Sequence, residues 1–439
     1  MSIWQKRWAT PLAVFVVSAS VYCGVAGTRL FSPSPNNHYV HLAAAWLDGR
    51  LDLGSVAPGT NDWACFDHVR SSACPPGRYA FPEDSMRYRW YVSFPPLPAA
   101  LLLPWVAVFG LGFLDRVFWF LVAGLTPTFF YLVLRALRER GWSGRTHVED
   151  LLVTALLAFG SVFFFAAVQG SVWFAAHVVA TACVCLYVLF SLNSRAPSLA
   201  GLFLGLAFLS RPATILLAPF FAVEAWSAYR GTDTVRASHA GFARVIFRFL
   251  VPIGACVALA MVHNVARFDD PTEFGHRFLQ IRWRTRIETW GLFDVHYLSR
   301  NLTVFFASLP WLYESRPFVR ISRHGLALWF TTPNLLWSLV PKQIDSRILG
   351  LWAAIVPTAL CGLLYQNTGW VQFGYRFALD YLPLLLLLVV LNGRRFDRLF
   401  WAFAAFSFFV NTFGALTFDR RPEFYDADTT QEVIFKPEE

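Results

Sequence analysis

The sequence concentrates its chemically useful side chains in two long polar segments, 29–93 and 267–324. The first segment is rich in carboxylates, and a carboxylate beside a membrane is suited to act as a general base toward a hydroxyl group. For any single carboxylate the plainer interpretation is a charge on a solvated loop, and the pattern alone leaves both readings open. The carboxylates are Asp48, Asp52, Asp62, Asp67, Glu83 and Asp84.

The second polar segment is rich in arginine instead. A guanidinium group presents a planar fork of donors that matches phosphate oxygens, so such a segment could hold the phosphate of a lipid. General attraction between arginine and anionic headgroups explains the same pattern equally well. The arginines are Arg267, Arg277, Arg282, Arg284 and Arg286.

Smaller polar features stand where apolar stretches end or break. An arginine in such a place is costly unless it is paired or hydrated, which makes Arg211 and Arg376 the strongest candidates for function. The alternatives are that Arg376 pairs with Asp380, four residues later, and that His177 is merely hydrogen-bonded. The features are Gln169-Gly170-Ser171-Val172-Trp173 before His177, Ser210-Arg211-Pro212, and Gln372-Phe373-Gly374-Tyr375-Arg376.

Signatures of several other chemistries are missing from the sequence. No GxxxxGK[ST], GxGxxG, HExxH or GxSxG element stands in a suitable context, so ATP hydrolysis, dinucleotide chemistry and zinc proteolysis have no support. The seven cysteines show no paired CxxC spacing of a metal site. Cys65 and Cys74 form a local disulfide if their segment faces an oxidising compartment, and otherwise remain thiols.

The elements that must position these groups are membrane helices. Of the 439 residues, 56% are hydrophobic and only 15% are charged, against roughly 25% charged in soluble proteins. Apolar stretches recur along the whole chain, which favours one all-α integral membrane unit over several soluble domains. The net charge of +9 comes from arginines in short clusters between these stretches, which disfavours nucleic-acid binding.

About eleven membrane spans are expected, since a crossing helix needs ~20 apolar residues. The first, 11–27, is interpreted as an uncleaved anchor, although Lys6 and Arg7 before it also fit a signal peptide. The stretch 95–113 either crosses or returns to its own side, and the re-entrant form is preferred because it leaves the arginine-rich short connections inside. The other spans are 117–134, 150–167, 174–192, 198–210 and 213–227, 248–266, 325–340, 347–365, 379–391 and 398–415.

This arrangement predicts a transmembrane unit over 1–416 with a cytoplasmic N-terminus and an external tail over 417–439. Both long polar segments are then external. Apolar residues recur at helical spacing in the first of them, so its start is expected to be a helix that lies along the membrane interface. These residues are Tyr39, Leu42, Ala43 and Trp46.

Several short stretches, spread over most of the chain, share one family pattern. They are Asn37–Ala43 with Leu47–Leu53, Asn61–Ala64, Trp90–Pro98, Ser210–Pro212, His263–Phe268 with Glu273–Gly275, and Gln372–Arg376. Each is weak alone. Together they resemble the GT-C-type membrane glycosyltransferases, and most closely bacterial members related to protein O-mannosyltransferases and lipid A aminoarabinose transferases.

The resemblance implies a GT-C-like helical bundle that transfers a sugar from polyprenyl phosphate to a hydroxyl acceptor with inversion. An external carboxylate would deprotonate the acceptor, and arginines would stabilise the leaving phosphate. The implied base is Asp62. The implied phosphate ligands are Arg211, Arg267 and Arg376, with Trp173 and His177 at the sugar. The other residues assigned to substrate binding are Asn37, His38, His41, Asp48, Asn264 and Glu273.

One departure from the family pattern bears on the base. Relatives carry an acidic residue soon after the first span, where this chain has Asn36-Asn37. The base is then Asp62 or, less favoured, Asp48 or Asp52; otherwise activity has been lost. No pattern requires a metal, although two nearby carboxylates could hold a divalent cation.

The resemblance further implies a multi-pass protein of the bacterial inner membrane, with its active site facing the periplasm or exterior. Its partners would be a polyprenyl-phosphate-linked sugar, a hydroxyl acceptor on lipid, glycan or protein, and membrane lipids. The main alternative is a transporter or a flippase of lipid-linked sugars. That class needs charged groups through the middle of several spans, whereas most spans here are apolar, and no inverted repeat is detected. An enzyme that moves whole oligosaccharides between lipids has the same physical needs and stays open.

Overall fold

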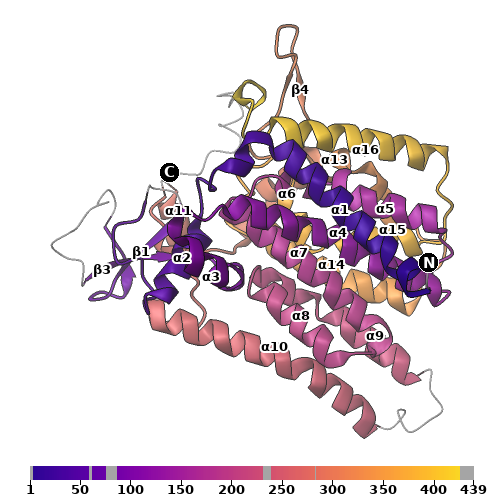
Figure 1. Cartoon of the computed structure of the whole chain (residues 1–439), viewed down its shortest axis with the longest axis horizontal. Coiled ribbons are helices and arrows are strands. Elements are labelled where there is room, and N and C mark those ends of the chain that lie inside the picture. Colours follow the sequence, from indigo (N-terminus) through magenta and orange to yellow (C-terminus); the bar gives the residue numbers. More distant parts are fainter. Residues whose placement is uncertain (1–2, 59–61, 76–86, 231–238, 282, 426–439) are drawn as a thin grey trace.

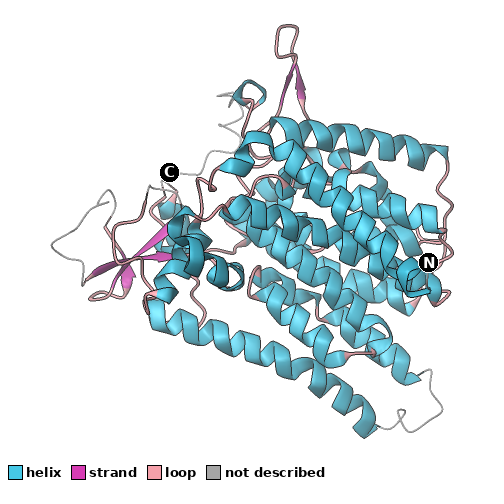
Figure 2. Cartoon of the chain, in the orientation of Figure 1, coloured by secondary structure: helices cyan, strands magenta, loops and turns pink. Residues whose placement is uncertain are grey.

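The computed structural model describes residues 3–58, 62–75, 87–230, 239–281 and 283–425, and these are mostly helical (Figure 1, Figure 2). The helices are α1 (Ile3–Ala26), α2 (His38–Leu47), α3 (Leu97–Phe109), α4 (Asp115–Glu139), α5 (His147–Phe159), α6 (Phe163–Ala167), α7 (Val172–Ser191), α8 (Pro197–Phe208), α9 (Pro219–Arg230), α10 (His239–Phe268), α11 (Arg284–Trp290), α12 (Leu298–Leu302), α13 (Leu328–Thr331), α14 (Ser346–Leu363), α15 (Leu382–Leu391) and α16 (Arg398–Thr417). The strands are β1 (Trp63–Asp67), β2 (Ser72–Ala73), β3 (Tyr88–Val92), β4 (Trp311–Leu312) and β5 (Val319–Arg320). Three 3-10 segments also position the site: η4 (Pro212–Leu217), η9 (Pro333–Leu339) and η10 (Arg376–Asp380).

Six described helices are long and apolar enough to cross a membrane, namely α1, α4, α7, α10, α14 and α16. The helices α3, α8 and α15 are apolar but shorter, so the expected number of about eleven spans is not confirmed. Proline explains one of the differences. Thr332 precedes Pro333 and leaves the helical region, which divides the expected span 325–340 into α13 and η9. The expected break at Ser210-Arg211-Pro212 is present between α8 and η4.

The ambiguous stretch 95–113 forms α3. This helix has 13 residues, or about 20 Å at 1.5 Å per residue, which is less than the ~30 Å of a bilayer's hydrocarbon core. It ends at Gly110, whose φ is positive as in many helix ends, and it packs against α2 and α7. These features favour the re-entrant form.

The helix expected at the start of the first polar segment is α2, but its surroundings differ from the expectation. Tyr39, Leu42 and Ala43 are buried in one apolar cluster with residues of β1 and α3. An amphipathic helix buries its apolar stripe against the nearest apolar surface, and here the protein itself provides that surface. The expectation that this face lies along the membrane interface is therefore wrong.

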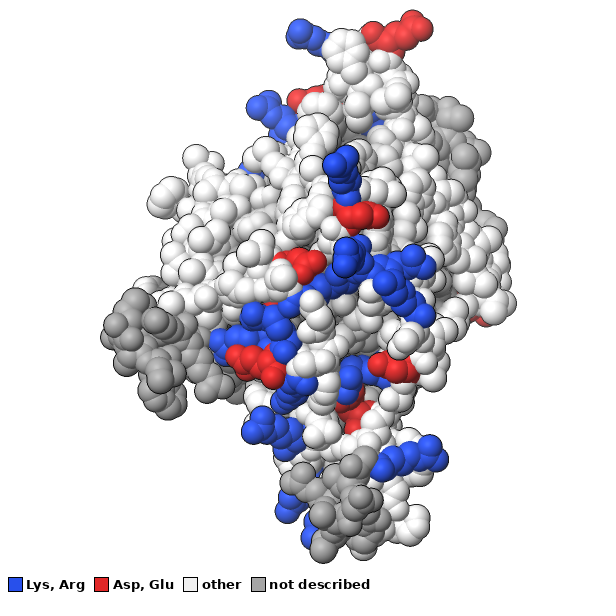
Figure 3. Space-filling model, turned by 90° about the vertical axis from the view of Figure 1, so that its right-hand side faces the viewer, with Lys and Arg blue, Asp and Glu red and all other residues white. Residues whose placement is uncertain are grey.

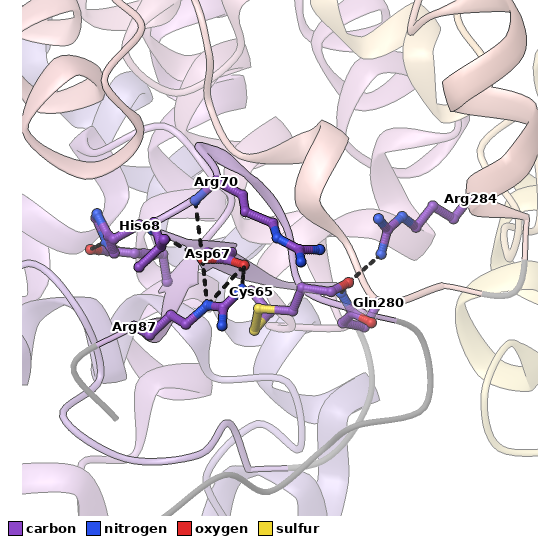
Figure 4. Close-up of a disulfide and its surroundings, with 10 residues drawn as sticks. Cys65, Asp67, His68, Arg70, Arg87, Gln280 and Arg284 are labelled. Carbon is purple, nitrogen blue, oxygen red and sulfur yellow. Dashed lines mark hydrogen bonds and ion pairs between the residues drawn. A yellow bond between two sulfur atoms is a disulfide. The ribbon is translucent and has the colours of Figure 1, made fainter. Parts of the chain in front are cut away.

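The first polar segment forms a small sheet with a disulfide, and hydrogen bonds join it to the second polar segment. The strands run in the order β2-β1-β3, all antiparallel, and Trp63 pairs with Val92. Cys65 and Cys74 form the disulfide, so of the two possibilities left open the structure shows the bond. Gln280 and Arg284 of the second segment donate to the carbonyl oxygen of Cys74 at 3.3 and 2.6 Å (Figure 4).

The end of the bundle at which α1 begins is strongly basic (Figure 3). Hydrogen bonds hold its connections together: Arg145 donates to Asn392 (3.1 Å), and Arg347 donates to Glu224 (2.8 Å). The sheet, α2 and α11 lie at the opposite end (Figure 1). Exposed basic residues of the basic connections are Arg195, Arg230, Lys342, Arg394, Arg395 and Arg398.

The beginning of the expected C-terminal tail is packed against the protein. Arg323 Nε donates to the carbonyl oxygen of Tyr425, and the backbone N–H of Ile321 donates to that of Phe424, both at 2.8 Å. Tyr425 is buried. The packed unit therefore extends beyond 416 to Tyr425, while 426–439 lie outside the described residues.

Candidate active site

Asp62 stands directly before β1. Its φ of 57° is in the left-handed region, which aspartate and asparagine enter more readily than most residues. Ser93 Oγ donates to the Asp62 backbone oxygen at 2.9 Å, and Trp173 Nε1 donates to Oδ2 at 2.5 Å. Burial raises the pKa of the Asp62 carboxyl above its usual value, and the Trp173 hydrogen bond and the charge of Arg376 partly offset that rise. A carboxylate with a raised pKa is a stronger base.

Arg376 is held in place but keeps one unused donor. Its backbone N–H donates to Gln372 Oε1 (2.9 Å), and its Nη1 donates to the carbonyl oxygen of Val371 (3.2 Å). The guanidinium carbon lies 5.2 Å from the centre of the Phe174 ring. Arg376 Nε is buried and has no hydrogen-bond partner among the described residues. The group is thus preplaced and still able to bind an oxyanion.

Arg211 is neutralised by Asp380. Its Nε and Nη2 donate to Oδ1 and Oδ2 of Asp380 at 3.1 and 2.9 Å, and His177 Nδ1 lies 3.2 Å from the same Oδ1. The alternative in which Arg376 pairs with Asp380 is therefore wrong. Both residues belong to η10, a 3-10 segment with about three residues per turn, so residues four apart do not share a face.

Two cavities meet at these side chains. The polar cavity has a volume of about 310 Å³, and Asp62, Trp173 and Arg376 line it. The apolar cavity has a volume of about 590 Å³ and is walled mainly by η4, α14 and residues 272–277 and 291–293. The residues that line both are Arg211, His276, Tyr365 and Phe377. A ligand with a polar head and an apolar chain matches this arrangement.

The polar cavity combines aromatic rings with unused hydrogen-bond donors. Besides Arg376 Nε, three buried donors have no partner among the described residues: Arg116 Nε, Gln169 Nε2 and Trp283 Nε1. Buried polar groups are normally satisfied, so several unused donors in one cavity indicate a ligand rich in acceptor oxygens. The aromatic residues of the cavity are Phe94, Trp173, Phe174, Trp283, Tyr365, Trp370, Phe377 and Phe418.

Some residues of the cavities carry no sequence signal that would single them out. His276 is one histidine in an arginine-rich segment, and its pKa is lowered to about 4 by burial and by the charges of Arg211 and Arg267, so it is neutral at pH 7. Tyr365 and Trp283 are aromatic residues among many. Arg116 does have a signal, because it is an arginine in a short outward connection, as Arg211 and Arg376 are.

Three residues expected to bind substrate have structural contacts instead. Arg267 is 0% exposed and lines neither cavity. Its Nη1 donates to the carbonyl oxygen of Val92 (2.6 Å) and its Nη2 to Asn264 Oδ1 (2.9 Å), which fastens α10 to β3. Glu273 lines the apolar cavity but accepts from the N–H of Gly275 (2.6 Å). Contact between Arg267 and a lipid phosphate does not fit this position.

The residues expected to bind substrate around α2 lie beside the polar cavity rather than in it. His38 stacks on Trp63 with 3.8 Å between ring centres, and His41 packs at right angles to the same ring at 5.6 Å. Asn37 stands at the N-cap position of α2, where its side chain makes no capping hydrogen bond. The neighbouring Asn36 does line the cavity.

The other described carboxylates of the first segment are engaged elsewhere. Asp48 and Asp52 lie 2.7 and 3.8 Å from Arg50, and neither lines a cavity. Arg87 donates to both oxygens of Asp67, which lowers the pKa of that carboxyl (Figure 4). Asp62 therefore remains as the described first-segment carboxylate in the polar cavity. Asn61, Glu83, Asp84 and Arg282 lie outside the described residues.

A metal ion has no matching ligand set in the part of the chain that the structure describes. No group of three or more His, Cys, Asp or Glu side chains comes together there. The two carboxylates that line the polar cavity, Asp62 and Asp419, have arginines as their charged neighbours. The divalent cation considered from the sequence thus finds no described residues that fit it.

The fold and the site define a helical membrane protein that gathers a carboxylate and arginines at one end of its bundle. No family model and no curated protein matches its sequence. It is similar to the oligosaccharyltransferase AglB of Archaeoglobus fulgidus in three solved structures. The apo form has 12% identity and a TM-score of 0.45, over 99% of this chain and 58% of that chain. The enzyme tethered to an acceptor peptide has 14% identity and a TM-score of 0.45, over 99% of this chain and 57% of that chain. The complex with an inhibitory peptide and a dolichol-phosphate has 14% identity and a TM-score of 0.45, over 97% of this chain and 56% of that chain. This chain thus spans less than two thirds of the length of each.

Proposed function

We propose that this protein is a membrane glycosyltransferase that moves a sugar from a polyprenyl-phosphate carrier to a hydroxyl acceptor, with Asp62 as the base. The observation that carries the proposal is the presence of Asp62 and Arg376 in a polar cavity that adjoins an apolar one. A lipid-linked sugar has matching parts in the same order: an apolar chain, a phosphate and a sugar.

Asp62 supplies a base with one oxygen available. Its Oδ2 accepts the hydrogen bond from Trp173, which leaves Oδ1 for the acceptor hydroxyl. The hydroxyl proton passes to Asp62, the acceptor oxygen bonds to C1 of the donor sugar, and the bond between C1 and the phosphate oxygen breaks. The electron pair of that bond stays on the phosphate. A single displacement of this kind inverts the configuration at C1.

Arg376 stabilises the departing phosphate. Negative charge grows on the phosphate as the bond to C1 breaks, so a preplaced cation favours the transition state over the ground state. Arg376 keeps Nε unpartnered among the described residues, whereas Arg211 already makes two hydrogen bonds to Asp380. We therefore assign the phosphate to Arg376. Arg211, with His177, holds Asp380 in place beside the junction of the cavities.

The apolar cavity suits the carrier chain. Ile215 and Leu216 of η4 form part of its wall, and Leu292 and Phe293 form another part. Phe293 and Leu216 are exposed, so this wall reaches the surface of the bundle. The interior of the bilayer is as apolar as this wall, so an isoprenoid chain can pass from lipid into the cavity without exposing its apolar surface to water.

The distribution of charge supports an external active site. Short cytoplasmic connections of membrane proteins carry an excess of arginine and lysine, which assigns the basic end of the bundle to the cytoplasm. The site lies at the opposite end, and the disulfide beside it is of the kind that forms in oxidising compartments. In a bacterium this corresponds to the inner membrane, with the cavities facing the periplasm or exterior.

The test is to incubate membranes that contain the protein with labelled polyprenyl-phosphate sugars and to follow the label into lipid, glycan and protein fractions. Asp62→Asn keeps the size of the side chain and tolerates its positive φ, so it removes mainly the charge and should lower transfer by about 10²–10⁴-fold. Asp48→Asn, an exposed carboxylate outside both cavities, should retain transfer. Full activity of Asp62→Asn would remove Asp62 from the mechanism. Movement of the lipid-linked sugar across liposome membranes without transfer would favour a flippase.

A further inference from the structure

A second group of arginines stands at another part of the polar cavity. It consists of Arg29, Arg116 and Arg420, which gather around Asp419. Of the three, Arg116 lines the cavity and is 7% exposed. Its Nη1 donates to Ser32 Oγ at 3.0 Å and to the carbonyl oxygen of Arg29 at 3.4 Å. Its Nε is buried without a partner among the described residues.

Gln169 supplies a further unused donor beside Arg116. Its side chain is 3% exposed and lines the cavity. Gln169 Oε1 accepts from Arg29 Nη1 at 3.1 Å, which leaves Nε2 as the donor, and this atom has no partner among the described residues. Gly170 allows the close approach, since it has a φ of 72° and a Cβ there would lie 2.7 Å from Arg116 Cγ. The backbone of the residue after Gln169 is thus packed directly against Arg116.

The charges of this group do not cancel. Three arginines face two carboxylates, Asp115 and Asp419, which leaves an excess of one positive charge. Asp115 is buried and accepts from the backbone N–H of Ser34 at 2.7 Å. Asp419 is paired with Arg29 at 3.4 Å, and 65% of its side chain is exposed. An uncompensated cation with unused donors indicates an anionic ligand.

This group is distinct from the phosphate position assigned to Arg376. Arg376 is held by Val371 and Gln372, whereas Arg116 is held by Arg29 and Ser32. A lipid phosphate stays attached to its chain and so must lie near the junction with the apolar cavity. Arg376, Arg116 and Gln169 all line the polar cavity alone, but the guanidinium carbon of Arg376 lies 5.8 Å from the centre of the Phe377 ring, which belongs to that junction. Arg116 instead contacts Arg29 and Ser32, which line neither cavity. Arg116 and Gln169 are therefore placed away from the carrier chain, in the part of the polar cavity that is left for the second substrate.

We infer that Arg116 and Gln169 bind an oxyanion carried by the acceptor, so that the acceptor is an acidic sugar or a phosphorylated glycan. This inference rests on the proposed function, because only a transferase needs an acceptor. A carboxylate or a phosphate supplies the oxygens that Arg116 Nε and Gln169 Nε2 lack, and the two chemistries are separated by the choice of probe.

The experiment measures binding of three probes to the purified full chain in uncharged lipid nanodiscs by isothermal titration. The probes are glucose, glucuronate and glucose 6-phosphate, which share a ring and differ in the acid. At least one acid should bind tenfold or more tightly than glucose, and the tighter of the two identifies the acid on the acceptor. Arg116→Gln should reduce the preference below twofold. Arg70→Gln, which changes an exposed arginine on the turn between β1 and β2, should keep it.

Two results would overturn the inference. One is equal binding of all three probes to the unmodified protein. The other is a preference that survives in Arg116→Gln but disappears in Arg376→Gln, which would place the anion at the donor phosphate. If Arg116→Gln does not fold, Gln169→Met decides: a reduced preference supports the inference and an unchanged one contradicts it. Binding is measured without donor, so this test can fail while transfer succeeds, and transfer can fail while the preference remains.

Discussion

Replacing Trp173 by phenylalanine removes one hydrogen bond from the proposed base and leaves an aromatic ring in the cavity. Trp173 Nε1 donates to Asp62 Oδ2 at 2.5 Å and thereby lowers the pKa of a carboxyl that burial raises. A hydrogen bond to a charged group is worth about 1.5–3 kcal/mol, and one pKa unit corresponds to about 1.4 kcal/mol. Trp173→Phe should therefore raise the pKa of the Asp62 carboxyl further.

The assay is the pH dependence of kcat/KM for sugar transfer. A general base must be deprotonated, so the acid limb of the profile should move to higher pH. On that limb kcat/KM should fall by about 10–100-fold, the factor that corresponds to a hydrogen bond of this strength. Trp283→Phe is the matched control, because Trp283 lines the same cavity and its Nε1 has no partner among the described residues. An acid limb that stays in place in Trp173→Phe, or that moves equally in Trp283→Phe, would refute the assignment of Asp62.

Three further outcomes concern stability and are measured by thermal unfolding or proteolysis in detergent. The pKa of Asp62 is raised in the folded protein, so ionisation of this carboxyl lowers the free energy of unfolding at pH above about 3.9. Asp62→Asn should therefore unfold at the same or a higher temperature than the unmodified protein at pH 7. A lower unfolding temperature would contradict this. Arg211→Gln leaves the Asp380 side chain, which is 4% exposed, without its main partner, and should lower the free energy of unfolding by about 3–5 kcal/mol. Adding Asp380→Asn should restore much of that free energy. Cys65→Ser with Cys74→Ser should cost about 2–3 kcal/mol and speed cleavage of the first polar segment, with helix content unchanged.

The grouping of Asp62, Arg211 and Arg376 was accessible from the sequence, although their chemical roles remain predictions. Arg211 and Arg376 stand where apolar stretches end, and helices that share a membrane bring such ends together. Asp62 lies within the first polar segment, and the resemblance to the glycosyltransferase family singled it out. The break at Ser210-Arg211-Pro212 and the short α3 follow from the same reasoning, since proline and length limit a helix locally.

What the sequence could not show depends on partners supplied from a distance. Arginine is a common phosphate ligand, but Arg267 donates to the carbonyl oxygen of Val92 in β3 instead. The spacing of residues in the sequence does not show which carbonyl oxygen a strand places beside Arg267. Asp380 accepts hydrogen bonds from Arg211, 169 residues away, and not from Arg376. The reason is that η10 is a 3-10 segment, in which residues four apart do not share a face as they do in an α-helix. The apolar face of α2 turns inward because α3 happens to lie beside it.

In the proposed transferase, the meeting of two cavities at Arg211, His276, Tyr365 and Phe377 provides a separate route for each substrate. A carrier that diffuses within the bilayer and an acceptor that arrives from water then do not compete for one entrance. The spent carrier can leave sideways into lipid while the extended product departs outward. Steady-state kinetics with both substrates varied should then show neither product blocking the entry of the other substrate.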